Sequence, residues 1–231
     1  MAKRNFQFLK EEFFHIYNRG NSKQIIFKDN QDYDRFMKLL YICNSEHNFK
    51  FRDDIIDSEI DAYAFDRGNP LVDILAWVLM PNHFHIYLKP SSHMSDMWEN
   101  KGKNVVTEFM RKVSTAYSKY FNLKYGRTGG LFEGAFKAEH IDNEPYAMYL
   151  FSYIHLNPLK LIQKDWKEIG IKDKNRAIEF LDSYIWGSYK DYSSEAQRLQ
   201  SKIIRKDILH SHLSNIKDFK KDIFNFINFQ P

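Results

Sequence analysis

The chain has 231 residues, of which 43% are hydrophobic and 28% charged, and its net charge is +4. This composition is typical of a globular domain with a substantial core and excludes a disordered chain, while the single cysteine, Cys43, excludes a disulfide framework and a cysteine-based zinc site. No apolar run reaches the roughly 20 residues of a membrane span, and Glu11 and Glu12 interrupt any N-terminal signal core. We therefore expect a cytoplasmic protein without membrane contact.

The first part of the chain predicts a strand followed by a helix. Residues 13–20 read as a strand that ends at a glycine, where a turn is easy. Asn30 or Asp32 then supplies a helix cap before a stripe of apolar residues at helical spacing. The acidic segment 52–66 follows, with six acidic side chains against one arginine. Its role stays open, either an insertion or a regulatory flap.

A β-hairpin is predicted next. Residues 72–80, VDILAWVLM, form a continuous apolar run of strand length. Pro81 and Asn82 form a turn, and HFHIYLK, residues 83–89, is the returning strand. The hairpin therefore places two histidines at the start of its second strand.

The second part of the chain predicts a helix, a strand and a helix. Residues 104–121 are amphipathic with helical spacing, and residues 131–141 read as a strand. A further helix opens at a capping Asp142 or Asn143. It ends near Asn157, because the proline that follows disfavours helical dihedral angles in the residue before it.

This order of elements predicts an α+β fold. An antiparallel sheet with packed helices is expected, in a ferredoxin-like or RNA-recognition-like layout. We assign residues 1–165 to one domain, which contains the predicted sheet and the candidate functional residues, and residues 166–231 to a C-terminal, mainly helical extension. The role of the helical tail from about Arg198 stays open: it could bind hairpin DNA, mediate dimerisation or cover the core.

Two histidines on one strand form the first candidate site. Side chains alternate along a strand, so His83 and His85 share one face while Phe84 and Ile86 share the apolar, core-facing side. We expect the histidines to avoid the core and to share one divalent ion. Histidines at the surface or in hydrogen bonds are the commoner explanation of such a pair. An oxygen ligand from elsewhere would favour manganese or magnesium.

The helix after residue 143 offers that oxygen ligand. Tyr146, Tyr149, Tyr153 and Asn157 have helical spacing and lie on one helix face. Asn157 is a neutral oxygen donor, and Tyr153 lies one turn of about 5.4 Å before it. A phenol at that distance could attack a substrate polarised by a metal. A tyrosine stripe more often packs against a neighbour, and spacing does not choose among the three tyrosines.

Several motifs together resemble a known family. MPNHFH and, about seventy residues later, YIHLNP are similar to motifs of the single-tyrosine HUH transposases, most of all the REP-associated tyrosine transposases. YNRGN after the first strand, FEGAFKAEHI and the late WGSYKDY fit the same pattern. The resemblance spans roughly residues 13–192.

The resemblance implies a function and a set of roles. His83 and His85 would bind Mg²⁺ or Mn²⁺, Asn157 would be the third ligand, and Tyr153 would be the nucleophile. The family cleaves and rejoins single-stranded DNA, often beside hairpins, through a 5′-phosphotyrosine intermediate and a free 3′-hydroxyl. DNA transposition without a nucleotide cofactor is the expected activity. We favour a monomer with its site in one chain, although a homodimer that shares its sites stays possible.

Basic residues are expected to contact the DNA. The stretch between Lys101 and His140 has eight basic side chains against three acidic ones, which suits phosphate contacts, although solvated helix faces also produce such runs. The strand-end turn adds two candidates, which the turn itself could equally explain. The DNA-binding candidates are Arg19, Asn21, Arg111, Lys112, Lys119, Arg127, Lys137 and Lys160.

Two other functions stay open. A domesticated descendant could bind hairpin DNA without cutting it, although the intact His83, His85, Tyr153 and Asn157 argue against that. A metal-dependent nuclease could use the same histidines with water as nucleophile, which would make Tyr153 dispensable. His155 is two residues from Tyr153 on the helix, so we expect it to face elsewhere and to be structural.

Overall fold

The structure is a computed structural model that describes residues 7–92, 94, 104–212 and 218–226. Lys101, in the basic stretch, and the last residues of the C-terminal extension lie outside these ranges. Among the residues described, every helix is too short or too polar to cross a lipid bilayer.

A four-stranded sheet organises the molecule. Its strands are β1 (Phe13–Arg19), β2 (Val72–Met80), β3 (His83–Pro90) and β4 (Lys137–Ile141). They lie in the order β2-β3-β1-β4, and every neighbouring pair is antiparallel. With the intervening helices this is the ferredoxin-like β-α-β-β-α-β arrangement. The predicted fold class is confirmed.

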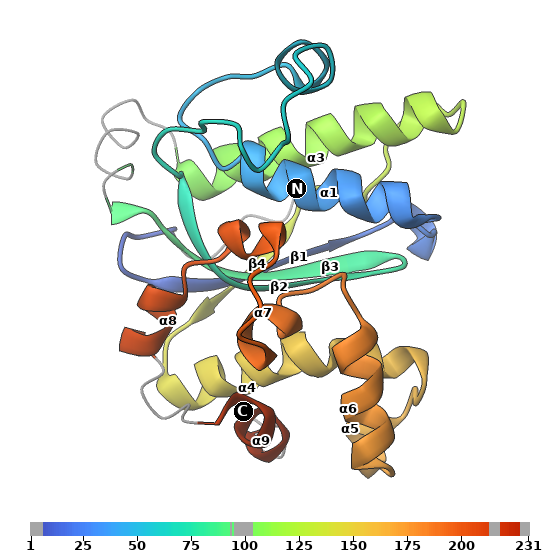
Figure 1. Cartoon of the computed structure of the whole chain (residues 1–231), viewed down its shortest axis with the longest axis vertical. Helices are drawn as coiled ribbons and strands as arrows, with labels where there is room; N and C mark the ends of the chain where they lie inside the picture. Colours follow the sequence, from blue (N-terminus) through green and yellow to red (C-terminus); the bar gives the residue numbers. More distant parts are fainter. Residues whose placement is uncertain (1–6, 93, 95–103, 213–217, 227–231) are drawn as a thin grey trace.

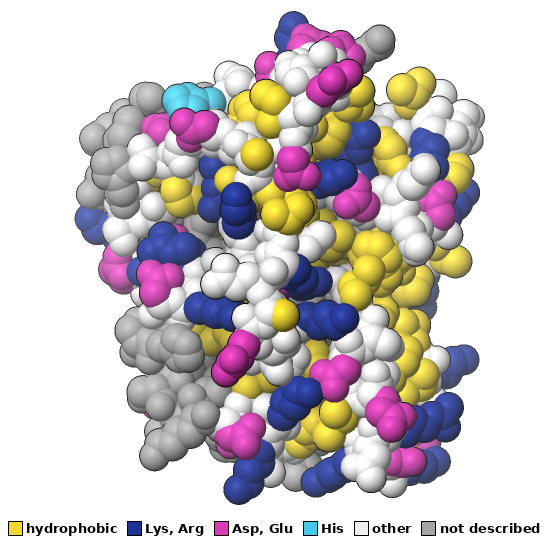
Figure 2. Space-filling view, in the orientation of Figure 1, with side chains coloured by type: hydrophobic (Ala, Val, Ile, Leu, Met, Phe, Trp, Pro, Cys, Tyr) yellow, Lys and Arg dark blue, Asp and Glu magenta, His cyan; other side chains and the backbone are white. Residues whose placement is uncertain are grey.

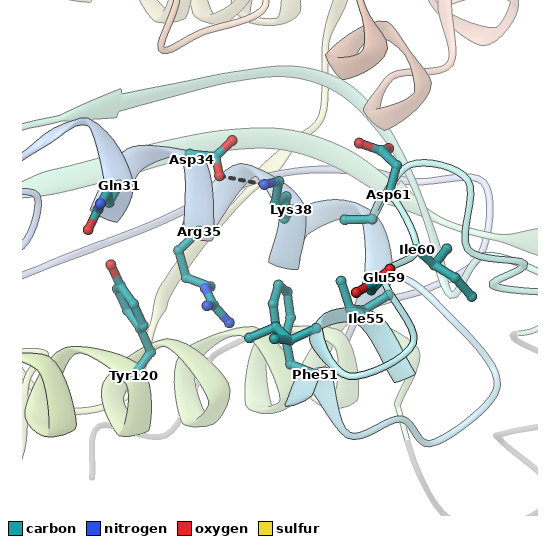
Figure 3. Close-up of a pocket in the computed structure, with 12 residues that line it drawn as sticks. Gln31, Asp34, Arg35, Lys38, Phe51, Ile55, Glu59, Ile60, Asp61 and Tyr120 are labelled. Carbon is teal, nitrogen blue, oxygen red and sulfur yellow. Dashed lines mark ion pairs between the residues drawn. The ribbon is translucent and has the colours of Figure 1, made fainter. Parts of the chain in front are cut away.

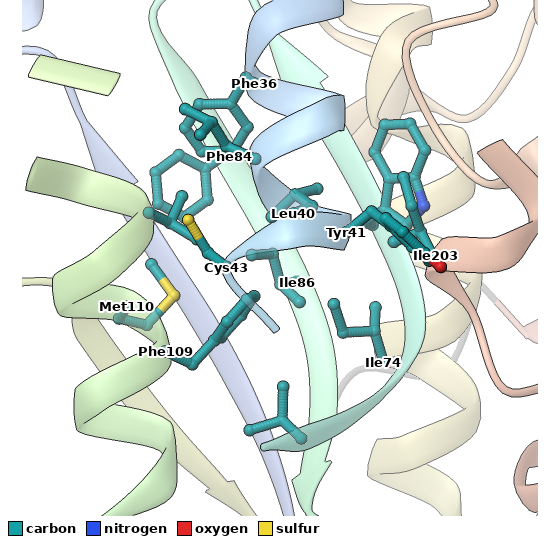
Figure 4. Close-up of a cluster of buried hydrophobic side chains, with 14 of the residues drawn as sticks. Phe36, Leu40, Tyr41, Cys43, Ile74, Phe84, Ile86, Phe109, Met110 and Ile203 are labelled. Carbon is teal, nitrogen blue, oxygen red and sulfur yellow. The ribbon is translucent and has the colours of Figure 1, made fainter. Parts of the chain in front are cut away.

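Two helices cover one face of the sheet (Figure 1). They are α1 (Asn30–Ile42) and α3 (Val105–Lys124). Phe84 and Ile86 point from β3 toward Phe36 of α1 and Phe109 of α3, and all four side chains are fully buried (Figure 4). The alternate, apolar residues of the central strands therefore form the first core.

Helix α4 (Glu144–Leu156) covers the opposite face, with α9 (Phe219–Phe226) packed against it (Figure 1). Its apolar side chains, among them Phe151 and Ile154, meet Val78, Met80 and Tyr87 of the sheet in a second core. Both faces of the sheet are therefore covered, and the two covers come from different parts of the chain.

Local capping explains where the helices begin. The Asp29 side chain accepts a hydrogen bond from the Asp32 backbone N–H at 3.1 Å, so the cap of α1 lies just before the two residues expected. Asp32 is instead buried, and its carboxylate binds Lys124 of α3 at 2.8 Å. Asn143 caps α4, as one of the two predicted caps, by accepting from the Tyr146 N–H at 2.8 Å.

Strand β4 is shorter than the sequence predicts. It was expected from residue 131, but the regular strand begins only at Lys137. Gly134 has a φ angle of 72°, in the left-handed region, which interrupts an extended backbone. Residues 131–136 therefore form an irregular approach to the strand.

The chain after residue 165 closes the exposed edge of the sheet. It forms α5 (Trp166–Ile169), α6 (Lys174–Ser183), α7 (Tyr189–Ser193) and α8 (Lys206–His212). Between these helices the backbone binds edge strand β2, with Leu79 N–H donating to the Trp186 carbonyl at 2.9 Å and Arg205 N–H to that of Ile74 at 2.8 Å. This part is mainly helical and shares both cores. It also protects an edge that could otherwise pair with another chain.

The acidic segment packs on the α1 and α3 side. It contains one π-helical turn (Arg52–Ile56), and Ile55, Ala62 and Tyr63 join the first core, whereas Ile56 and Ile60 are exposed. A cavity of about 500 Å³ lies between this segment, α1 and α3, with Arg35, Phe51 and Tyr120 among its lining residues (Figure 3). The segment is therefore remote from the face of the sheet that carries the histidines.

Candidate active site on the histidine face of the sheet

Strand pairing gathers four polar aromatic side chains on one face. Side chains of directly paired residues in an antiparallel sheet point the same way. Tyr17 of β1 pairs with His85, and Arg19 pairs with His83. His15, two residues before Tyr17, lies on the same face. We call the face that carries His15, Tyr17, His83 and His85 the histidine face.

His85 is buried, contrary to the expectation that the histidines avoid the core, whereas His83 is partly exposed. His85 is only 7% exposed, because α4 lies over this face. Burial lowers the pKa of His83 to about 4, with a further lowering from the charge of Lys160. Burial also lowers the pKa of His85 well below the usual histidine range. Both rings are therefore neutral at pH 7, the form in which imidazole binds metals.

Tyr153 is the tyrosine that meets the histidine pair. Its ring lies 5.4 Å from that of His85, centroid to centroid, at 77°. Tyr149 stacks on Tyr153 at 6.1 Å, and the Tyr146 hydroxyl donates to Glu139 at 2.9 Å. Among the ring contacts of the described residues, Tyr153 alone of the three touches a histidine of the pair. The packing of α4 on the sheet thus distinguishes Tyr153 from the other two tyrosines by its contact with His85.

Two lysines flank Tyr153. Lys160 Nζ donates to the phenol oxygen at 3.4 Å, and Lys167 Nζ lies 4.0 Å from the centre of the ring. Lys160 comes from the 3₁₀ helix that follows α4 (Asn157–Leu161), and Lys167 comes from α5. These positive charges would stabilise negative charge on the phenol oxygen and on a phosphate beside it.

Asn157 is buried beside the pair with its amide unused. It is 0% exposed, and neither its Oδ1 nor its Nδ2 has a hydrogen-bond partner among the described residues. Burial lowers the pKa of His83, whereas a polar side-chain interaction with Asn157 raises it. A buried amide without partners is destabilising. An additional ligand at this point would remove that cost.

The ring nitrogens of both histidines are already ordered. His83 Nδ1 lies 2.7 Å from Asn82 Oδ1. The Nδ2 of the same Asn82 amide donates to the Lys23 carbonyl at 3.2 Å. Since Asn82 Oδ1 only accepts, His83 Nδ1 carries the proton and Nε2 carries the lone pair. His85 Nδ1 lies 2.8 Å from His15 Nε2. On both rings the Nδ1 atom is occupied, which leaves Nε2 for a ligand.

No group of three or more His, Cys, Asp or Glu side chains among the described residues could hold a metal ion. The candidate donors for a divalent cation are therefore the two Nε2 atoms together with the unused Asn157 oxygen. The oxygen donor would move the preference towards manganese or magnesium. A cation there would also satisfy the amide that the protein itself leaves without a partner.

Four of the DNA-binding candidates lie on or beside the histidine face. Arg19 is next to His83 across the strand pair, and it forms an exposed ion pair with Glu133. Lys137 is exposed on β4 opposite Tyr17. Asn21 is exposed just beyond the end of β1, and Lys160 is at Tyr153.

The other four candidates lie elsewhere. Arg111, Lys112 and Lys119 are on α3, which covers the opposite face of the sheet, and Arg127 follows that helix with its guanidinium over Phe121. Lys112 is 9% exposed and donates to the carbonyls of Ser45 at 2.8 Å and His47 at 2.9 Å. Its charge is therefore used inside the protein, and no surface that DNA could touch includes it.

Charge is mixed on the side shown in Figure 2, where basic and acidic side chains alternate without forming one basic patch. On α3, Arg111 is paired with Glu108 along the helix and Lys119 is exposed, as on a solvated helix face. Lys112 and Lys124 instead contact groups of other segments.

His155 is structural, as expected. Its Nδ1 donates to the Phe151 carbonyl at 2.8 Å and its Nε2 lies 2.9 Å from Ser188 Oγ. Ser188 in turn binds the backbone of Trp77 on edge strand β2. His155 therefore joins α4 to the segment that closes the sheet edge, and it points away from Tyr153.

The site also includes residues that were not predicted for it, among them His15, Tyr17, Glu139 and Lys167. His15 alternates with Tyr17 on the predicted first strand, and Glu139 pairs with His15 across β1 and β4. That alternation was a usable signal, but it requires knowing that β1 lies between β3 and β4. Lys167 lies in a four-residue helix with no motif, and nothing in the sequence pointed to it.

The similarity to known proteins is structural. No protein-family model matches the chain, and no curated protein sequence does. A REP-associated tyrosine transposase bound to a REP hairpin is 13% identical with a TM-score of 0.48, over 87% of this chain and 90% of that one. A candidate transposase from Deinococcus radiodurans is also 13% identical, with a TM-score of 0.33, over 65% of this chain and 93% of that one.

Proposed function

We propose that this protein cleaves and rejoins single-stranded DNA with Tyr153 as the nucleophile, in the manner of a single-tyrosine HUH transposase. The observation that carries the proposal is the contact between Tyr153 and His85, with ring centres 5.4 Å apart, beside the buried and unpartnered amide of Asn157. The sequence motifs MPNHFH and YIHLNP supply these residues. A nucleophile and a ligand set therefore meet on one surface.

His83, His85 and Asn157 would hold Mg²⁺ or Mn²⁺. When bound, the cation would offset the charge that develops on a non-bridging phosphate oxygen. The protein contributes neutral imidazoles whose Nδ1 atoms are held by Asn82 and His15. Because these partners order the rings beforehand, little reorganisation is needed on binding.

The chemical step forms one bond and breaks another. The phenol oxygen of Tyr153 attacks phosphorus while the bond from phosphorus to the 3′-oxygen breaks. The proton lost by the phenol is balanced by the proton that the 3′-oxygen gains. The products are a 5′-phosphotyrosine and a free 3′-hydroxyl, and a later 3′-hydroxyl reverses the step without ATP. Lys160, 3.4 Å from the phenol oxygen, stabilises the charge that this oxygen carries as its proton leaves.

The surroundings suit a nucleic-acid strand. Arg19, Asn21, Lys137 and Lys167 supply donors for phosphates around the histidine face, and the stacked Tyr149 offers a flat ring on which an unpaired base could stack. The cavities of about 500 and 430 Å³ are lined by other residues than His83, His85 and Tyr153. One chain supplies both tyrosine and histidines, which favours a monomer acting in cis.

A denaturing gel tests the proposal. The protein is incubated with labelled single strands from the DNA that flanks its gene, with Mn²⁺ or with a chelator. We expect a covalent adduct that needs Mn²⁺, is lost in Tyr153→Phe and persists in Tyr149→Phe, the matched control on the next turn of α4. Cleavage that survives Tyr153→Phe would instead indicate water as the nucleophile. Hairpin binding without cleavage would indicate a protein that only recognises DNA.

A further inference from the structure

The histidine face contains a chain of polar contacts that continues behind His85. His85 Nδ1 lies 2.8 Å from His15 Nε2, and the two rings are stacked with centres 5.0 Å apart. On the other side of His15, its Nδ1 lies 3.5 Å from Glu139 Oε2. His15 is 6% exposed, so these two neighbours account for both of its ring nitrogens in a setting that water barely reaches.

Glu139 determines which atoms donate and which accept along this series of contacts. The hydroxyl of Tyr17 donates to one of its oxygens at 2.7 Å and that of Tyr146 donates to the other at 2.9 Å. Contacts with His15 and with these two hydroxyls lower the pKa of Glu139 to about 2, so it is an anion that only accepts. The ring nitrogen of His15 that faces it therefore carries a proton.

The remaining protons follow from the chemistry of neutral imidazole. A neutral ring has one N–H and one lone pair. With its proton on Nδ1, His15 presents the Nε2 lone pair to His85, which must then donate from its own Nδ1. The lone pair of His85 is thereby left on Nε2. The reverse direction would place a proton on His85 Nε2 and would turn the unprotonated side of His15 toward a carboxylate.

We propose that Glu139 and His15 are positioning residues that hold His85 in its Nδ1–H form, so that the Nε2 lone pair is available to a divalent cation. The statement about protons concerns the protein alone, whereas the statement about the cation rests on the proposed function. His83 is ordered differently, by Asn82 from the adjacent turn. The site thus combines an imidazole that is held by its neighbour in the turn with one that is held by residues of β1 and β4.

The first test observes the protons directly. Long-range proton–nitrogen correlation spectra of metal-free protein labelled with ¹⁵N-histidine distinguish the Nδ1–H from the Nε2–H form. We expect the Nδ1–H form for His85 in the wild type. His15→Phe keeps a ring in place but removes the acceptor, so the Nε2–H form should appear. In His15→Gln the amide oxygen can accept in place of Nε2, and the Nδ1–H form should persist.

The second test measures Mn²⁺ binding without DNA, from the electron paramagnetic resonance signal of free Mn²⁺. We expect His15→Phe to weaken binding by roughly 10- to 100-fold, the usual effect of losing an outer partner of a metal-binding histidine. His15→Gln should restore most of the affinity. Glu139→Gln, which removes the anion, should weaken binding, while Glu179→Gln on α6 is the matched control and should not. Thermal unfolding confirms that each variant is folded.

The outcomes separate the two proposals. An Nε2–H form of His85 in the wild type would overturn the proposed positioning by Glu139 and His15, whatever the Mn²⁺ result. The Nδ1–H form together with no Mn²⁺ binding in the wild type would support this positioning and overturn the proposed function. Equal Mn²⁺ affinity in the wild type and a folded His15→Phe would show that the positioning does not affect cation binding.

Discussion

The two faces of the sheet are built from alternate residues of the same strands, yet one face forms an apolar core and the other carries the candidate site. On one face Phe84 and Ile86 meet α1 and α3 in the first apolar core. On the other, His83 and His85 lie under α4 among polar aromatic side chains. The comparison shows that burial alone does not distinguish a core from a site. What distinguishes the histidine face is the kind of polar atom gathered there: imidazole nitrogens, the Tyr153 phenol and the unpartnered amide of Asn157.

The largest expected effect comes from substituting two neighbouring residues of β3 that point to opposite faces of the sheet. Phe84→Ala should lower the free energy of unfolding by about 3 to 5 kcal/mol, because it leaves a cavity in the first core. His83→Ala should unfold near the wild-type urea concentration but lose the Mn²⁺-dependent adduct. Urea titration and the denaturing gel measure the two effects. Loss of the adduct in a folded Phe84→Ala, or its retention in His83→Ala, would contradict this division.

The free energy of unfolding should depend on pH through a buried histidine of α4, the helix that covers the histidine face. Burial lowers the pKa of His155 to about 3, whereas an unfolded histidine titrates near 6.5. Between these values the unfolded chain binds more protons, so the free energy of unfolding falls as the pH decreases below about 6.5. At pH 5 this histidine alone should lower it by about 2 kcal/mol relative to pH 7.

Urea titrations at pH 7 and pH 5 measure this effect. His155→Gln should reduce the difference between the two pH values, even where the substitution lowers stability at both. His47→Gln, which changes an exposed histidine in the loop after α1, serves as the control and should leave the difference unchanged. The same pH dependence in wild type and His155→Gln would show that His155 is not the group responsible.

The smallest expected effect concerns stability, and its sign is informative. Asn157→Leu replaces a buried amide that has no partner with an apolar side chain of similar size. The free energy of unfolding should stay the same or rise by about 1 kcal/mol, while Mn²⁺ affinity falls. Asn18→Leu is the matched control, since both ends of that buried amide are hydrogen-bonded, and it should destabilise the protein. A destabilised Asn157→Leu would mean that its amide has partners after all.

Much of the fold followed from local patterns. The bounds of β2, the start of β3 and the end of α4 agree with the sequence, since they depend on apolar periodicity, a proline-asparagine turn and a proline after Asn157. The same periodicity places His83 and His85 on one face.

Only the tertiary structure decided which residues join the pair. Tyr146, Tyr149 and Tyr153 are equivalent in spacing, and the packing of α4 on the sheet brings Tyr153 to His85. Pairing between β1 and β3, about seventy residues apart, brings His15 into contact, and β4 adds Glu139. These contacts depend on strand order, which no local pattern encodes. Lys112 shows the reverse: a basic side chain on a helix surface proved to be buried because the loop after α1 folds over it.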